Sequence, residues 1–461
     1  MSAPPGSERW APSGKYFRLL VLGIFGLVLY FSQPFRYPFD CKSSSGTAQG
    51  SRLLNLSTKT PYPHRTANDS ESTGSANSLT MIQLHHISRH GARYPTEPSF
   101  DSINRVFNNF RPYVPQSWIK LELVDARLEG LLAHGAEKAI EGIARRAVDR
   151  NGGFLKQRLL EKPQSVRFLS SQWQRSKKTG KIFRNIVDPL GATQPLRAVP
   201  VEKDTTMAMR FSCPLYSHER QKSSLLVHQE VAKFDYIHGR SIQEKVSSRL
   251  AAISSAQVVP TMGEVSTMYS LCGYDQSLFA NPHHWCTLFD PELTSLLELR
   301  NDIRYSHVYG PYGHQINKNI ACALFTQIIH DIDQAERDPS NAVSTLRFAH
   351  AETIMFISTL LELENVLGSG NVPITGNMSL SDAAARGFKS TELVPFSSNM
   401  DIEVYEDGSS QLLFRLLLNE RPIRLPGCLD DICHMDVLRK RLQGKIGCDF
   451  ANICKLDSAK N

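Results

Sequence analysis

Hydrophobic runs of strand length alternate along the chain with helical patterns. Strands are predicted over Met81–Ile87, Ser165–Leu169 and Ser344–Ala349. Helices are predicted over 131–149, where apolar residues recur at spacings of three and four, and over 175–187. Strands that alternate with helices predict an α/β fold with a mostly parallel sheet and flanking helices.

Residues 200–335 have a different character. Helical runs at 291–302 and 320–332 are separated by loops rich in Gly, His and Tyr. We therefore predict a helical cap inserted into an α/β core, and this core consists of residues 80–199 and 336–461.

The N-terminal part of the chain is predicted to direct it into the secretory pathway. A tail, 1–18, carries basic residues and precedes an uncharged, strongly apolar segment, 19–35. The apolar part is typical of a signal peptide and short for a spanning helix of ~20 residues. No small-x-small cleavage site follows, so we predict an uncleaved membrane anchor, with a cleaved signal peptide as the alternative.

Residues 36–79 are rich in Ser and Thr and are predicted to form a disordered stalk. Asn55, Asn68 and Asn377 each begin a glycosylation acceptor triplet. Together with the apolar segment, these triplets predict that the body of the protein is lumenal or extracellular.

Nine cysteines are consistent with disulfide bonds in an oxidising compartment. Proximity predicts the pairs Cys272–Cys286 and Cys428–Cys433. The odd count leaves one free thiol, for which Cys322, within an apolar run, is the candidate.

Composition excludes several classes of protein. The 461 residues are 41% hydrophobic and 21% charged, which excludes a wholly disordered, fibrous or multispanning protein. The net charge of +7 is modest and suits an anionic small molecule. No run of five basic residues exists, so nucleic acid is not an expected partner.

The sharpest chemical signal is the segment Arg89–Pro95, which reads RHGARYP and follows the first predicted strand. Arginine forks bind a phosphoryl group in bidentate fashion and stay charged at any biological pH. They would hold phosphate over His90, which can attack phosphorus when its imidazole is neutral. Gly91 lets the backbone turn and approach closely.

This segment resembles the RHGxRxP signature of the histidine acid phosphatases. His350-Ala351-Glu352, which follows the third predicted strand, is similar to the second motif of the multiple inositol polyphosphate phosphatase (phytase-like) subgroup. The resemblance extends over about residues 80–455. It implies a phosphoglycerate-mutase-like sheet with a helical cap, and a disulfide between Cys213 and a C-terminal cysteine.

The resemblance also implies a role for each site residue. His90 would be the nucleophile and Glu352 the proton donor, while the scissile phosphate would be bound by Arg89, Arg93, Arg175 and His350. Arg167 is a weaker alternative to Arg175. Lys177 and Lys178 could contact outer substrate phosphates, or they could be a solvated helix face. The arginines supply the positive charge, so neither a metal nor another cofactor is expected.

The predicted function is therefore a phosphomonoester hydrolase that acts on inositol polyphosphates such as phytate through a phosphohistidine. The resemblance adds 2,3-bisphosphoglycerate as a second substrate. The alternatives are a broad-specificity acid phosphatase, a mutase-type phosphotransferase, or a catalytically silent membrane-tethered binding protein.

Overall fold

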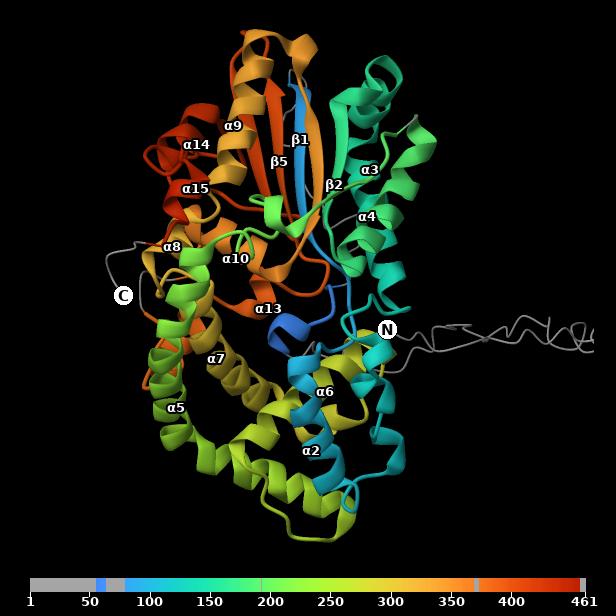
Figure 1. The fold of residues 1–461 in the computed structure, drawn as a ribbon, viewed down its shortest axis with the longest axis vertical. Helices are drawn as coiled ribbons and strands as arrows, with labels where there is room; N and C mark the ends of the chain where they lie inside the picture. The colour runs from blue at the N-terminus through green and yellow to red at the C-terminus, as the bar shows by residue number, and fades with distance from the viewer. Residues whose placement is uncertain (1–54, 64–78, 192, 369–372, 457–461) are drawn as a thin grey trace, which may run out of the picture. The chain divides into compact units, whose positions relative to one another are not determined.

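A mixed sheet forms the centre of the protein. The computed structural model describes residues 55–63, 79–191, 193–368 and 373–456. In these residues the sheet has eight strands in the order β3-β2-β4-β1-β5-β6-β7, with β8 paired to β6 (Figure 1). The strands are β1 (Thr80–Arg89), β2 (Val166–Ser171), β3 (Arg197–Val199), β4 (Ser344–Ala349), β5 (Asn399–Glu406), β6 (Leu412–Leu418), β7 (Arg421–Pro422) and β8 (Ile432–His434).

Strands β3, β2, β4 and β1 are parallel, and β5 joins β1 in antiparallel fashion. The predicted α/β fold is confirmed, and the three predicted strands correspond to β1, β2 and β4. The last residue of β1, Arg89, is the register partner of Ala349, the last residue of β4. The two segments that follow these strands therefore start side by side.

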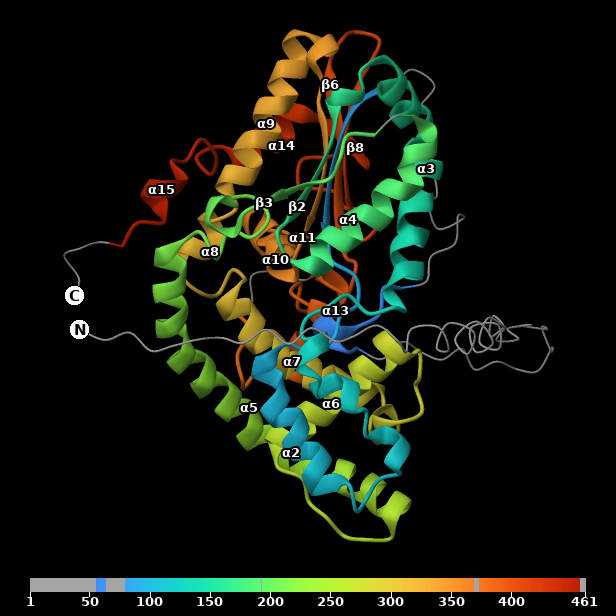
Figure 2. The same cartoon turned by 45° about the vertical axis from the view of Figure 1, so that its right-hand side comes forward.

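Helices cover both faces of the sheet. Figures 1 and 2 show α3 (Ala136–Glu161) and α4 (Gln174–Val187) on one side and α9 (Cys322–Arg337) on the other. Side chains alternate along a strand, so neighbouring residues face opposite layers. His86 contacts Phe183 of α4, with ring centroids 4.9 Å apart.

Helix α3 begins five residues later than predicted and continues for twelve residues beyond the predicted end. Residues 131–133, which were expected to form its first turn, make backbone hydrogen bonds to another segment instead. Leu131 accepts a hydrogen bond from Tyr94, and Ala133 donates one to Ala92. Leu132 forms an isolated bridge with Arg93. Residues 131–133 therefore pair with the RHGARYP segment, and this pairing prevents a helical turn.

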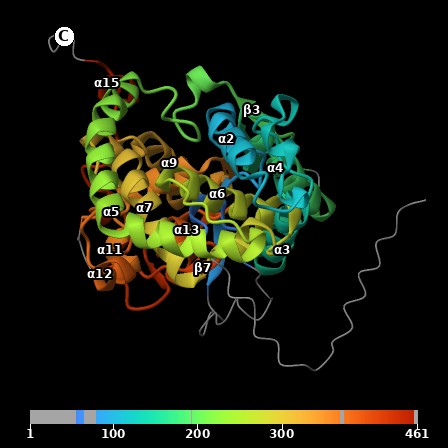
Figure 3. The same ribbon diagram turned by 90° about the horizontal axis from the view of Figure 1, so that it is seen from below.

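Helices α6, α8 and α13 pack against the long helices α5 and α7. In Figures 1 and 3, α2 lies beside α6, although the predicted core range contains α2. Conversely, α9 packs against β1, although most of it falls in the predicted cap range. The division into core and cap stays a prediction. The bounds are α2 (Phe100–Phe110), α5 (Pro214–Ser254), α6 (Met262–Phe279), α7 (Pro291–Val308), α8 (Gln315–Asn319), α10 (Ala351–Leu360), α11 (Glu364–Leu367), α12 (Leu380–Ala385), α13 (Ser390–Leu393), α14 (Met435–Leu442) and α15 (Phe450–Ile453).

The predicted disordered stalk, 36–79, is wrong for residues 55–63. Leu56 is buried, and the short 3-10 helix η1 (Ser57–Lys59) packs into the body. The backbone N–H of Ser57 donates to Thr391 Oγ1 at 2.9 Å. Polar side chains thus fix this segment through hydrogen bonds that sequence patterning does not reveal.

The predicted anchor, 19–35, lies outside the described residues. Within those that are described, no helix has the length and hydrophobicity needed to span a membrane. Asn68 is also outside them, whereas Asn377 is exposed. Asn55 is half-buried and donates from Nδ2 to Ser295 Oγ at 3.3 Å. The glycosylation sites stay predictions.

The structure pairs eight cysteines, and one prediction about them is wrong. The expected pairs Cys272–Cys286 and Cys428–Cys433 are present, and Cys213 pairs with Cys454, as the resemblance implied. Cys322, predicted to be free, pairs with Cys448. Its apolar run is the buried first turn of α9, and burial is equally compatible with a thiol and a disulfide.

We expect a thiol-alkylating reagent to label none of these eight cysteines in protein unfolded without a reductant. The ninth, Cys41, lies outside the described residues, so at most one cysteine is labelled. Peptide mass spectrometry locates the label, and a reduced sample serves as the positive control. Labelled Cys322 or Cys448 in the unreduced sample would contradict the pairing.

Candidate active site

The ends of three adjacent parallel strands meet at one edge of the sheet. His90 follows β1, His350 follows β4, and Arg175 lies in the first turn of α4 after β2. The backbone N–H of His90 donates to Ala349 O at 3.1 Å. The imidazole centroids of His90 and His350 are 5.6 Å apart. Two motifs that are far apart in the sequence therefore share one site.

His90 presents a neutral imidazole with one nitrogen available. Its Nδ1 lies 2.8 Å from Gly91 O, so Nδ1 carries the hydrogen and donates it. In the described residues no hydrogen bond engages Nε2. Burial, followed by the charges of Arg175 and Arg89, lowers the pKa of His90 well below its ordinary value. Nε2 therefore has a free lone pair.

Gly91 is required because helix α3 approaches the loop closely. A Cβ atom on Gly91 would lie 2.8 Å from Ile140 Cδ1, which is closer than real contacts allow. The Gly91 N–H donates to Thr179 Oγ1 at 3.1 Å, and that hydroxyl donates to Arg175 O at 2.8 Å. Thr179, which sequence reasoning missed, thus ties the histidine loop to the first turn of α4.

Arg89 is buried beside the histidine. Its Nη1 donates to the carbonyl oxygens of Thr58, at 2.7 Å, and Val394. Its guanidinium lies over the Phe396 ring, 4.3 Å from the centroid. Burial and the charge of Arg93 lower its pKa to about 9, so it stays a cation at neutral pH. Uncharged groups hold Arg89 in place, and its charge remains available.

Arg93 and Arg175 complete a cluster of cations. Arg93 Nη1 donates to the carbonyl of Tyr94 at 2.7 Å. Burial and the charge of Arg93 lower the pKa of Arg175 to about 10. Among the described residues, the buried Nε–H groups of Arg89, Arg93 and Arg175 have no acceptor. Buried donors are normally paired, so this cluster is built to receive an anion.

His350 joins the site at the N-terminus of α10. Its Nε2 lies 2.9 Å from Ser171 Oγ, and its ring meets Trp173 edge-on at 4.9 Å. Burial lowers the pKa of His350 to about 3; Glu352 opposes this shift and Arg175 adds to it. The neutral ring can donate to phosphate, and the positive end of α10 points to the same place.

Glu352, in the first turn of α10, forms an ion pair that the sequence did not predict. Arg210 Nε donates to Glu352 Oε1 at 2.7 Å. Burial raises the pKa of Glu352, but the positive charge of Arg210 outweighs burial and holds the pKa well below its usual range. Arg210 lies in the predicted cap range with no motif around it, so no signal in one sequence could identify it.

The remaining predicted residues lie less centrally. Lys178 Nζ forms an ion pair with Glu137 Oε1 of α3 at 2.7 Å, which competes with a role in substrate binding. Lys177 is half-exposed on the same helix. Arg167 is exposed near the first residue of β2, whereas the site lies beyond its last residue. The structure therefore brings Arg175, and not Arg167, to the other arginines.

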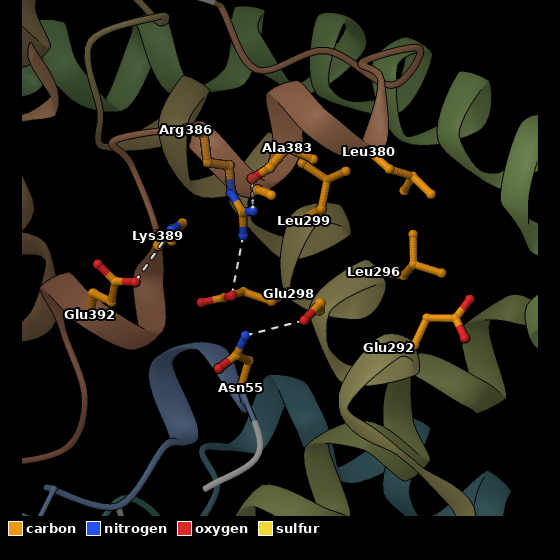
Figure 4. Close-up of a pocket in the computed structure, with 12 residues that line it drawn as sticks. Asn55, Glu292, Leu296, Glu298, Leu299, Leu380, Ala383, Arg386, Lys389 and Glu392 are labelled. Atoms are coloured by element: carbon orange, nitrogen blue, oxygen red, sulfur yellow. Dashed lines mark hydrogen bonds and ion pairs between the residues drawn. The ribbon is translucent and has the colours of Figure 1, made fainter. Parts of the chain in front are cut away.

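A separate pocket of about 390 Å³ is lined by none of these residues, but side chains at this pocket help to hold Arg89 in position (Figure 4). Its buried Arg386 donates to Glu298 at 3.2 Å and to Asp302 at 2.7 Å. Glu298 also accepts from the Thr391 N–H at 2.8 Å. Thr391 in turn holds η1, whose Thr58 carbonyl binds Arg89. The paired charges of this pocket therefore help to position Arg89.

Comparison with curated proteins found multiple inositol polyphosphate phosphatases and a thiamine-repressible acid phosphatase of Schizosaccharomyces pombe. The chain is 25% identical over 395 residues to multiple inositol polyphosphate phosphatase 1 of Gallus gallus, covering 81% of this chain and 84% of that protein. It is 25% identical over 277 residues to the Homo sapiens protein of the same name, covering 57% of this chain and 54% of that one.

Solved structures share the fold. The phytase from D. castellii matches with a TM-score of 0.69 at 14% identity, over 88% of both chains. The Bifidobacterium longum multiple inositol polyphosphate phosphatase in complex with inositol hexasulfate matches with a TM-score of 0.64 at 15% identity, over 84% of this chain and 96% of that one. Residues 80–419 match the histidine phosphatase superfamily (branch 2), and the chain therefore belongs to that family.

Proposed function

We propose that this protein hydrolyses phosphomonoesters of inositol polyphosphates through a phosphohistidine intermediate. One observation carries the proposal: three guanidinium groups, whose buried Nε–H donors have no acceptor among the described residues, lie around a neutral histidine. This arrangement suits a phosphoryl group and no neutral ligand. The names of the curated relatives support inositol polyphosphates as the substrate class.

In the first step, Arg89, Arg93, Arg175 and His350 bind the scissile phosphate. His90 Nε2 attacks phosphorus, an N–P bond forms, and the bond from phosphorus to the leaving oxygen breaks. The leaving alkoxide takes a proton from Glu352. In the second step, Glu352 takes a proton from water, whose oxygen attacks phosphorus and releases phosphate from His90.

Arg210 explains how Glu352 can hold a proton at the right moment. In the ligand-free site the ion pair with Arg210 favours the carboxylate. A bound phosphate dianion attracts Arg210 and weakens that pair, and burial together with the new negative charge then favours the protonated acid. Substrate binding thus prepares the proton donor.

The test of the function is to trap the intermediate. Rapid mixing with ³²P-labelled inositol hexakisphosphate, followed by an alkaline quench, should leave label on His90 that is lost in acid. His90→Ala should lower turnover about 10⁴-fold or more and carry no label. Turnover of the His90→Ala variant at the wild-type rate, or labelling at another residue, would refute the nucleophile assignment.

The Glu352→Gln variant should separate substrates by their leaving groups. An alcohol leaving group needs a proton, so hydrolysis of inositol hexakisphosphate should slow by about 10²- to 10⁴-fold. p-Nitrophenolate leaves without a proton, and its ester should be affected far less. Single-turnover rates measure the chemical step directly, and equal losses on both substrates would argue against the acid role.

Replacing Arg210 should change the pH profile. In Arg210→Met the pKa of Glu352 rises, because burial remains and the opposing charge is gone. Glu352 then keeps its proton to higher pH in the free enzyme, so the alkaline limb of the kcat/KM profile moves upward in pH. Arg240→Met, at an exposed position of α5, is the matched control. An unmoved limb in Arg210→Met would show that Arg210 does not control Glu352.

A further inference from the structure

The segment that carries Arg210, residues 204–212, forms neither a helix nor a strand. In Figure 2 it belongs to the green loop that leads from β3 to α5. One carboxylate shapes its first turn. Asp204 Oδ1 accepts hydrogen bonds from the backbone N–H groups of Thr206, at 3.2 Å, and Met207, at 2.7 Å. This turn gives the segment a local shape but does not attach it to the active site.

Two hydrogen bonds attach the segment to α10, and they involve adjacent residues of that helix. Thr353 Oγ1 donates to the carbonyl oxygen of Met207 at 2.6 Å. Arg210 Nε donates to Glu352 Oε1 at 2.7 Å. Among the described residues, the other hydrogen bonds of the segment all stay within residues 201–212. The bond from Thr353 is therefore the attachment that lies next to the ion pair.

Burial makes the hydrogen bond from Thr353 important. Thr353 is 1% exposed and Met207 is 0% exposed, so solvent does not reach either group. A buried carbonyl that loses its donor pays the full cost of desolvation, and this cost holds Met207 in place. Arg210 follows three residues later, and its guanidinium lies 3.8 Å from the centroid of the Phe211 ring. A fixed backbone and this ring thus restrict a long side chain that is flexible when free.

The hydroxyl and the backbone of Thr353 serve different partners. The backbone N–H of Thr353 donates to the side chain of His350, which caps α10. The hydroxyl donates to Met207 and accepts only a long hydrogen bond, of 3.4 Å, from the His350 N–H. A valine at position 353 would keep the backbone N–H and the branched shape, and it would remove the hydroxyl. The two contacts can therefore be separated by one substitution.

Several other charged or titratable groups act on Glu352, and none of their side chains bonds to the Thr353 hydroxyl. They are Arg89 of β1, Arg175 of α4, Tyr216 of α5, Tyr309 after α7, and His350 after β4. Among the described residues, Arg210 is the group that forms an ion pair with Glu352. A change in the position of Arg210 would therefore alter the charge balance at Glu352 and leave these other groups in place.

We propose that Thr353 is a positioning residue, whose hydroxyl holds the Met207 carbonyl and thereby fixes Arg210 against Glu352. The proposal rests on the proposed function, because Glu352 is the proton donor of that function. Thr353 acts through Arg210 and does not touch the phosphate through its hydroxyl. Loss of the hydroxyl should therefore change the protonation of Glu352 more than the binding of substrate.

The test is the pH dependence of kcat/KM for inositol hexakisphosphate. In Thr353→Val the alkaline limb should move upward by about half a pH unit, because a displaced Arg210 opposes protonation of Glu352 less. Thr353→Ser keeps the donor and should leave the limb at the wild-type position. Arg210→Met/Thr353→Val should give the same limb as Arg210→Met, since the hydroxyl acts through Arg210.

The matched control is Thr294→Val. Thr294 is also fully buried, but its hydroxyl donates to Pro291 O, at 3.2 Å, within the first turn of α7. An unmoved limb in Thr353→Val, an equal shift in the control, or a further shift when Thr353→Val is added to Arg210→Met would overturn the proposal. If Thr353→Val does not fold, Thr353→Ser decides: a wild-type limb supports the role of the hydroxyl, and a moved limb refutes it.

If wild type releases no phosphate from inositol hexakisphosphate, the proposed function fails, and the position of Arg210 is then tested without turnover. Carbon-13 NMR of the glutamate carboxyl groups follows the titration of Glu352 in the ligand-free protein, with the signal assigned by its loss in Glu352→Gln. A higher midpoint in Thr353→Val than in wild type and Thr294→Val supports the positioning role. Equal midpoints refute it.

Discussion

Repulsion between like charges is the constraint on which this site depends. Arg89, Arg93 and Arg175 lie around the imidazole of His90, and Arg210 lies near that of His350. Burial together with the charge of Arg93 lowers the pKa of Arg89 and of Arg175. Among the described residues, Glu352 is the carboxylate paired within this group. A phosphate dianion relieves this repulsion when it binds. Part of the binding free energy of the phosphate therefore comes from the repulsion that folding creates between the arginines.

The scaffold tolerates this repulsion because neutral groups hold the cations. Carbonyl oxygens of Thr58 and Val394 and the face of Phe396 stabilise Arg89 without cancelling its charge. Those groups are held in turn by α13 and α7, where Arg386 is paired with the carboxylates of Glu298 and Asp302. Charged side chains thus have two separate roles. Arginines that are paired with carboxylates support the structure, whereas the unpaired arginines of the site are left to bind the ligand.

The local motifs made much of the fold and the site predictable. RHGARYP and His-Ala-Glu identified five site residues, and the family resemblance added Arg175; the structure places all six next to the ends of adjacent strands. Arg210 could not be found this way, because its role depends on a contact with a residue 142 positions away. The same holds for η1, which hydrogen bonds to distant side chains keep in place, and for Cys322, whose partner lies 126 positions later. Local patterning is uninformative about such pairings.

The central position of β1 also governs how the protein can be made. Its neighbours β4 and β5 are synthesised about 250 and 310 residues later, as their bounds show. The nascent chain therefore carries an unpaired strand, which is buried in the folded protein, while most of the polypeptide is still being translated. An unpaired strand edge favours aggregation until its partners have been synthesised, so the sheet is assembled late.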